Sequence, residues 1–131
     1  VRMEALEGRP DAPDTAAIRE GLRAGWLQVL EVANDIALQP LVRTLGRGEA
    51  EVIGLAQERG ADVVVLDDRA ARRVAGAVGL QVIGTVGVLV AARRIGIIPA
   101  VVPLLEELRE QGFRLSDDVL DAIRRDEEPN S

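Results

Sequence analysis

Three carboxylates in the middle of the chain have the type and spacing that could hold a metal ion. Glu49 follows Gly48 at the start of an apolar helical pattern, and the adjacent acids Asp67 and Asp68 end the charge-free run 63–66. Helix N-termini and the carboxyl ends of buried strands are where open α/β sheets build their sites. Carboxylate oxygens suit hard divalent cations such as Mg²⁺ and Mn²⁺. This part of the sequence therefore predicts a site for one of these cations.

The composition excludes most other catalytic groups. The 131 residues include no His, Cys, Lys or Tyr. There is consequently no thiolate or lysine nucleophile, no imidazole base, no Cys-based zinc site and no disulfide framework. What remains is chemistry carried by acids and a metal, or no catalysis at all. A chain without cysteine also fits a reducing cytoplasm, where we expect the protein to act.

The charged residues point to limited, local contact with anions. All 16 basic residues are arginine, a side chain suited to phosphate and carboxylate recognition, and the net charge is −6. An acidic balance argues against a protein coated with nucleic acid. The acidic net charge is still compatible with a local group of arginines around an acidic site.

Glu49 has two interpretations. On a helical wheel it lies on the same side as the apolar residues Ile53 and Ala56, whereas Glu51 and Glu58 lie near the opposite side and are expected to face water. A carboxylate on the core-facing stripe is costly unless something there uses it. Acids are also favoured in a first helical turn by the helix dipole. The sequence leaves both the metal ligand and the dipole interpretation open for Glu49.

The pair Asp67 and Asp68 also has two interpretations. One of them could cap the helix that begins at Arg69. Two adjacent acids exceed what a cap needs, and like charges repel unless a cation lies between them. A phosphorelay receiver would need a lysine, a haloacid-dehalogenase phosphatase an Asp-x-Asp, and a dinucleotide-binding turn a Gly-x-Gly-x-x-Gly spacing. The sequence has no lysine and no Asp-x-Asp, and the segment 84–87 reads Gly-Thr-Val-Gly, which lacks the dinucleotide-binding spacing.

Five arginines follow the acidic pair at helical spacing or end the next helix. They are Arg69, Arg72, Arg73, Arg93 and Arg94. A solvated face with compensation of the helix dipole accounts for most of them. Arg69 and Arg72 are closest to the acids, so they are the candidates to hold a phosphodiester.

The elements that must position these residues alternate between helices and strands. Helices are expected over 13–24, 48–59, 69–78, 85–94, 99–111 and 116–125, strands over 26–32, 62–67 and 81–83, and 37–45 is ambiguous. The pattern predicts an α/β fold, a parallel sheet flanked by helices on both faces. We expect one domain over residues 1–126 and a polar tail over 127–131.

A long charge-free stretch from Val74 to Ala92 has the length of a membrane span. Glycines interrupt it at four positions, and Gln81 and Thr85 are polar. A buried helix–strand–helix passage explains the stretch better, so no membrane contact is expected.

The order of these motifs resembles the PIN-domain superfamily, in particular prokaryotic PIN proteins similar to VapC-type toxins. The segments that carry the resemblance are Gly48-Glu49-Ala50-Glu51, Leu66-Asp67-Asp68, Gly84-Thr85-x-Gly87, Gly96 and Gly112-Phe113-Arg114-Leu115-Ser116. Together they span nearly the whole chain, from Val1 to about Arg125.

The resemblance implies a metal-dependent ribonuclease whose acids gather at a parallel sheet. Glu4 resembles the early helical Glu of the family, Glu49 the third acid, and Asp67 or Asp68 the fourth. The first acid, which follows the first strand in the family, has no counterpart here. We therefore expect the first strand to be missing from this sequence, which would weaken the metal site more than the fold.

The sequence is compatible with two classes of function. The first is an endoribonuclease that cleaves single-stranded RNA with Mg²⁺ or Mn²⁺. The second is a non-catalytic PIN-like module that works through a protein partner. By resemblance, the partner would be a small antitoxin protein, and a homodimer is expected.

Overall fold

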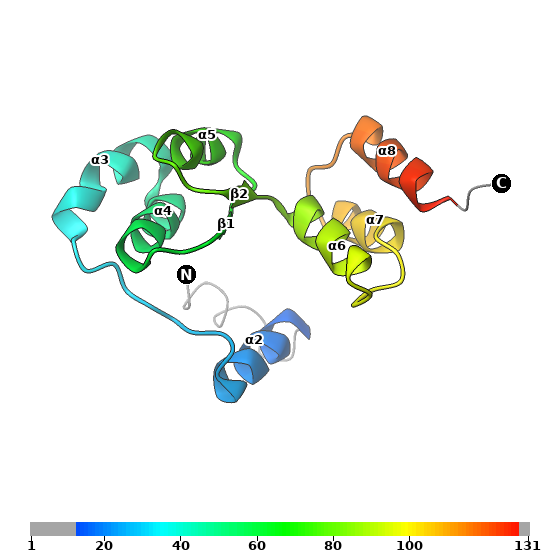
Figure 1. Cartoon of the computed structure of the whole chain (residues 1–131), viewed down its shortest axis with the longest axis horizontal. Helices are drawn as coiled ribbons and strands as arrows, with labels where there is room; N and C mark the ends of the chain where they lie inside the picture. Colours follow the sequence, from blue (N-terminus) through cyan, green and yellow to red (C-terminus); the bar gives the residue numbers. More distant parts are fainter. Residues whose placement is uncertain (1–12, 129–131) are drawn as a thin grey trace. The chain divides into compact units, whose positions relative to one another are not determined.

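The computed structural model describes residues 13–128, with side chains from Thr15 onward, and helices dominate it (Figure 1). The elements, in chain order, are α2 (Pro13–Ala24), α3 (Asp35–Leu45), α4 (Arg47–Arg59), β1 (Val64–Val65), α5 (Arg69–Ala77), β2 (Val82–Ile83), α6 (Thr85–Arg94), α7 (Val102–Glu110) and α8 (Asp117–Glu127). Six of these helices match the expected ones within a few residues. Helix α3 resolves the ambiguous segment.

Polar caps and glycines fix most of the helix ends. The Asn34 side chain accepts a hydrogen bond from Ala37 N at the start of α3, and Ser116 does the same for Val119 N at the start of α8. Such caps satisfy backbone N–H groups that have no partner inside the helix. Helix α4 ends at Gly60, whose left-handed φ of 65° is open to glycine at little cost.

Strands β1 and β2 form a two-stranded parallel sheet. Val64 N donates to Gln81 O at 2.9 Å, and Leu66 N donates to Ile83 O at 3.0 Å. Because the strands are parallel, their carboxyl ends lie at the same edge of the sheet. The parallel pairing therefore agrees with the expected α/β class, while coverage of both faces by helices stays a prediction.

The strand expected over residues 26–32 is wrong. The structure has no regular element there, and the Trp26 side chain is 74% exposed. Apolar content favours a strand only where a neighbouring strand can complete its hydrogen bonds, and this segment pairs with none among the described residues.

The described chain divides into two compact units. One holds the residues up to Val64 together with Asp68–Val82, and the other holds Val65–Asp67 together with Ile83 onward.

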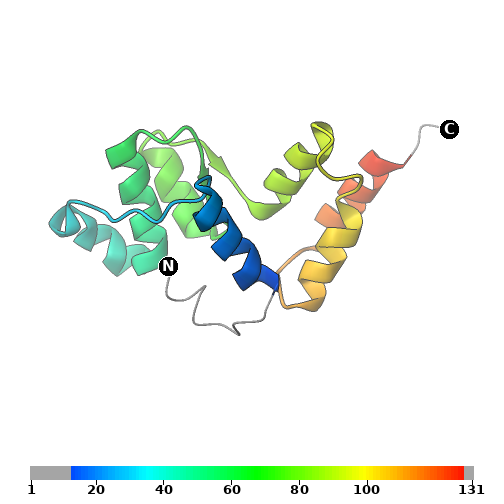
Figure 2. The same ribbon diagram turned by 90° about the horizontal axis from the view of Figure 1, so that it is seen from below.

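In the first unit, α3 and α4 pack side by side (Figures 1 and 2). Leu38 of α3 and Ile53 of α4 are both buried. A Cβ atom on Gly54 would lie 2.7 Å from Leu38 Cδ1, so the absence of a side chain at Gly54 lets the two helices approach closely.

In the second unit, α6, α7 and α8 share a small apolar core. Val101, Leu105 and Leu120 are buried there, and half-buried residues of all three helices pack around them. Glu127, near the end of α8, accepts hydrogen bonds from the backbone N–H groups of Val101 and Val102. The end of α8 thereby holds the start of α7.

No helix within residues 13–128 is long and apolar enough to cross a membrane. The charge-free stretch is instead divided among α5, β2 and α6. The expected helix–strand–helix passage is confirmed.

Candidate metal centre

Asp68 is the N-cap of α5. Its Oδ2 accepts a hydrogen bond from Ala71 N at 2.9 Å, and its backbone is extended, with φ −67° and ψ 129°. Its carbonyl accepts the first helical bond, from Arg72 N at 2.9 Å. This is the cap that the sequence assigned to one member of the acidic pair.

Asp67 makes a different set of contacts, with the start of α6. Its Oδ1 accepts from Thr85 N at 2.8 Å, and its Oδ2 accepts from the Thr85 hydroxyl at 2.6 Å. Helix α6 begins after Gly84, which has no side chain to serve as a cap. The Asp67 carboxylate takes over that function from the end of β1, although Asp67 itself is an exposed residue.

Glu49 lies in the first turn of α4 and is half-buried. Within the described residues its side chain forms no hydrogen bond and no ion pair. Its neighbour Glu51 pairs with Arg47 instead, at 2.9 Å. The apolar stripe expected beside Glu49 is present, since Ile53 and Ala56 are buried.

Glu58, expected to face water, has a structural role as well. Its carboxylate accepts hydrogen bonds from Ala33 N at 2.9 Å and Asn34 N at 3.0 Å. These bonds hold the pKa of Glu58 below its ordinary value. The side chain thus ties α4 to the segment that leads into α3.

The described residues bring together only part of the predicted ligand set. Asp67 and Asp68 are consecutive at the end of β1, while Glu4 lies outside the described residues. From residue 13 to residue 128, no three acidic side chains form a group that could hold a metal ion. Whether Glu49 and Glu4 join the pair stays a prediction.

The donors that are present nevertheless suit the predicted cation. They are all carboxylates, and Asp67 and Asp68 lie on the surface, where water can complete a coordination shell. Mg²⁺ commonly keeps several waters and uses only one or two protein carboxylates. An oxygen-only pair of this kind fits Mg²⁺ or Mn²⁺ in its chemistry.

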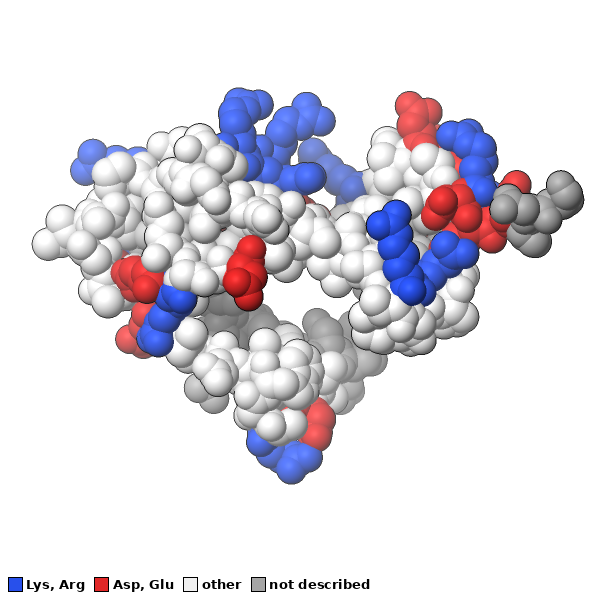
Figure 3. All heavy atoms as spheres, viewed as in Figure 1, with Lys and Arg blue, Asp and Glu red and all other residues white. Residues whose placement is uncertain are grey.

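Helix α5 carries an exposed basic face next to the acidic pair. Basic side chains gather over this helix in Figure 3, and Arg69, Arg72 and Arg73 are all exposed. Within residues 13–128 none of the three forms an ion pair, whereas Arg93 lies 3.6 Å from Asp126 and 3.7 Å from Glu127. The guanidinium groups of α5 are thus available to an outside anion.

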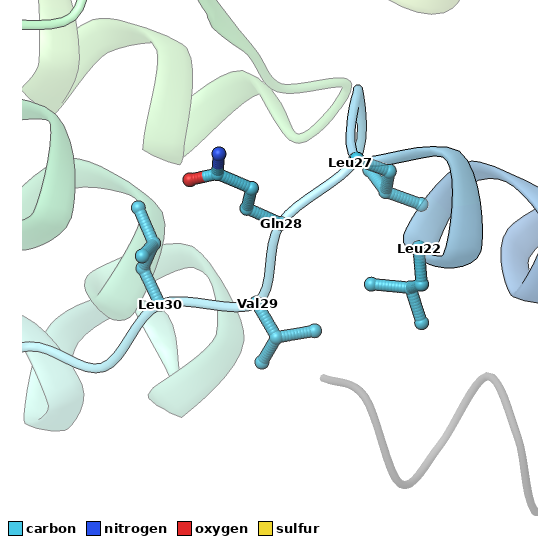
Figure 4. Close-up of a pocket in the computed structure, with 6 residues that line it drawn as sticks. Leu22, Leu27, Gln28, Val29 and Leu30 are labelled. Carbon is cyan, nitrogen blue, oxygen red and sulfur yellow. The ribbon is translucent and has the colours of Figure 1, made fainter.

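An open hollow lies in the first unit, beside the end of α2 (Figure 4). Its volume is about 480 Å³, and its lining residues are Leu22, Gly25, Leu27, Gln28, Val29 and Leu30. It contains no acidic or basic side chain, so it offers contact area rather than catalytic groups.

Thr85 is the site residue that sequence reasoning missed. Its contact with Asp67 joins residues 18 apart, which no local pattern reports. A signal did exist: a glycine at the start of a helix that follows a strand leaves a helix N-terminus in need of an outside acceptor. A carboxylate at the end of the neighbouring parallel strand is the nearest source of one.

Comparison with known proteins gives a match over nearly the whole chain. A family model described as a PIN domain matches residues 1–128. No curated protein and no solved structure matches the chain.

Proposed function

The chain belongs to the PIN-domain family, and on that premise we propose that it is a metal-dependent endoribonuclease similar to the VapC-type toxins. Its substrate would be single-stranded RNA, and it would act in the cytoplasm. The observation that carries the proposal is the family match over nearly the whole chain. The absence of His, Cys, Lys and Tyr supports it, because hydrolysis must then depend on acids and a metal.

In this proposal, Glu49, Asp67 and Asp68 hold Mg²⁺ or Mn²⁺, and Glu4 completes the ligand set. When bound, the cation supplies an activated water and offsets charge that develops on the phosphate. Asp67 and Asp68 follow β1, at the edge of the sheet where the strands end. Glu49 is also suited to accept a proton, since the described residues leave its carboxylate without a partner.

Arg69 and Arg72 would hold the RNA backbone beside the acids. Guanidinium groups bind phosphate oxygens with two parallel hydrogen bonds. Both side chains are exposed and unpaired within the described chain, so binding RNA would break no existing ion pair. They would also lower the repulsion between an acidic site and a polyanion.

Cleavage of a labelled single-stranded RNA in Mn²⁺ tests this function. We expect Mn²⁺-dependent cleavage that EDTA abolishes, and a loss of at least about 100-fold in Glu49→Gln, since a metal-bound or proton-accepting group is lost. Glu51→Gln is the matched control, on the same helix and engaged with Arg47. Its activity should stay within a factor of about two, because an exposed ion pair contributes little. EDTA-resistant cleavage, or full activity in Glu49→Gln, would refute the mechanism.

A second function is favoured by the apolar surface near the end of α2. Trp26 is 74% exposed beside the hollow lined by residues 22–30, and Ile36 of α3 is 86% exposed. Exposed apolar surface of this kind often marks a protein interface. The alternative is a non-catalytic module that binds a small antitoxin protein or a second copy of this chain.

Calorimetric titration with Mn²⁺ separates the two functions. An enzyme should bind the ion, and the double variant Asp67→Asn/Asp68→Asn should not. A module whose acids are vestigial should show no heat of binding in either form.

A further inference from the structure

Residues 28–32, between α2 and α3, form a segment without turn or bend whose backbone is unpaired. The segment belongs to no helix or strand, and within the described residues none of its N–H or C=O groups forms a hydrogen bond. The chain is held on either side of it, since Leu27 N donates to Gly21 O at 3.2 Å and Ala33 N donates to Glu58 at 2.9 Å. Between these anchors a stretch of backbone is free to pair with another strand.

The side chains of this segment are those of a β-strand. Figure 4 shows Gln28 and Val29 on opposite sides of the backbone, which is the alternation of a strand. Val29 is 49% exposed, Leu30 is 39% exposed and the preceding Trp26 is 74% exposed. Residues 26–32 contain one charge, Glu31, and none of the prolines or lysines that proteins commonly place on exposed strands to prevent pairing.

We propose that this segment pairs with the same segment of a second copy of the chain, as an antiparallel ribbon centred on Val29. Adjacent residue pairs in an antiparallel ladder alternate between hydrogen-bonded and non-hydrogen-bonded. A two-fold axis makes symmetry-related pairs alike, so one residue must lie opposite its own copy. The proposal names the partner for the apolar surface near the end of α2, and it stands whether or not the chain cleaves RNA.

The side chains favour this register and this partner. With Val29 opposite its own copy, Trp26 lies opposite Val32, and an aromatic residue opposite a β-branched one is a favourable cross-strand pair. Glu31 then lies opposite Leu27, so the two carboxylates of the ribbon are far apart. A register centred on Glu31 would place them directly opposite each other, which is destabilising. A second copy therefore offers an uncharged centre and no facing like charges.

The outer edges of β1 and β2 are the alternative partners within the described residues. Each of these strands has only two residues, whereas the segment 28–32 offers five. Asp67 and Asp68 directly follow the end of β1, so pairing there would bring Glu31 toward a second group of acids. The free segment thus matches a copy of itself better than it matches either strand.

Single cysteines test the register, because the sequence has no cysteine and each substitution gives one thiol per chain. Residues directly opposite in an antiparallel pair have Cα atoms about 4.5 or 5.5 Å apart, which is within disulfide range. Val29→Cys should therefore give a disulfide-linked dimer with oxidised glutathione, and Leu27→Cys should give little. Ile36→Cys, at an 86% exposed position of α3, is the control for random collision.

Sedimentation velocity of the full chain over a series of concentrations measures the association without a cross-link. We expect a reversible monomer–dimer equilibrium. One of the variants Val29→Pro and Leu30→Pro should weaken it at least about 10-fold and the other much less, because successive N–H groups point to opposite edges of a strand and each lost bond counts twice in a symmetric ribbon. Val65→Pro is the matched control, since the neighbours Val64 and Leu66 donate to β2 and the Val65 N–H points to the outer edge of β1.

Four results would overturn the proposal. They are a chain that stays monomeric at every concentration, a cross-link that is strongest in Leu27→Cys or Ile36→Cys, an equilibrium that neither proline in the segment weakens, and one that only Val65→Pro weakens. The cysteine variants keep every backbone N–H, so they decide the register even if a proline variant fails to fold. A monomer that cleaves RNA with Mn²⁺ overturns this inference and leaves the ribonuclease proposal in place.

Discussion

At the scale of single residues, the carboxylates of this chain differ in which donors they accept from. Asp68 and Glu58 both accept backbone N–H groups: Asp68 caps its own helix, and Glu58 ties α4 to the segment that leads into α3. The carboxylate of Glu49 accepts from no group in residues 13–128, although the residue is half-buried. A half-buried acid without a partner costs free energy that a ligand can recover. This contrast is the reason to place Glu49, and not Glu58, among the candidate catalytic groups.

Glu58→Gln should lower the melting temperature at neutral pH and lose that effect in acid. The lowered pKa of Glu58 means that its carboxylate stabilises the fold at pH values above its ordinary pKa of 4.5. That contribution falls away as the pH drops through the lower pKa of the folded state, where the carboxylate becomes protonated. Melting curves of the parent and the variant should therefore converge between about pH 5 and pH 3.

A surface glutamate provides the control for this pH dependence. Glu110 is exposed and its side chain forms no hydrogen bond within the described chain, so Glu110→Gln should leave the melting temperature nearly unchanged at every pH. A gap between Glu58→Gln and the parent that is constant with pH would contradict the role of the Glu58 charge.

At the scale of elements, α5 combines a packed face with a basic one. Ala71 and Ala75 are buried, while its three arginines are exposed and α5 contains no acid. Small buried residues hold the helix close to its neighbours, while Arg69 and Arg73 extend from the opposite face and Arg72 lies at the margin. Helix α5 therefore exposes positive charge to solvent.

Removing two of these charges should weaken RNA binding in a salt-dependent way. Arg69→Gln/Arg72→Gln should lower the affinity for single-stranded RNA. It should also reduce the slope of log K against log salt by about 0.7 for each phosphate that an arginine no longer neutralises. Fluorescence anisotropy in EDTA, where no cleavage occurs, measures both quantities. Arg125→Gln on α8, also exposed and unpaired among the described residues, is the control. An equal loss of affinity in Arg125→Gln would mean that only net charge matters.

Local chemistry explains which elements could be predicted from the sequence. The caps Asp68 and Ser116 act on the residues that follow them, so the sequence alone identifies them. The expected strand over 26–32 was wrong because a strand depends on a partner that the local pattern does not contain. The same limit hid the contact of Thr85 with Asp67, which exists only because β1 and β2 run in parallel. The sequence supplied the acids of the candidate site, and the fold supplied their orientation.

At the scale of the whole molecule, charge is the property that a bound cation changes most. The chain has a net charge of −6, and two of its acids are adjacent at the end of β1. Like charges in one place oppose the compact state, and a divalent ion between them relieves that repulsion. An ion that binds only the folded chain must also raise the stability of the entire fold.

Mn²⁺ should therefore raise the melting temperature of the full chain. At a free concentration 100 times the Kd, the free energy of unfolding should increase by about 2.7 kcal/mol, which corresponds to several degrees for a chain of this size. Asp67→Asn/Asp68→Asn is the matched variant, and its own melting temperature without metal is the baseline for the comparison. With Mn²⁺ it should show no further rise. If Mn²⁺ stabilises the double variant as much as the parent, the ion binds elsewhere, and the edge of the sheet is not the metal site of this protein.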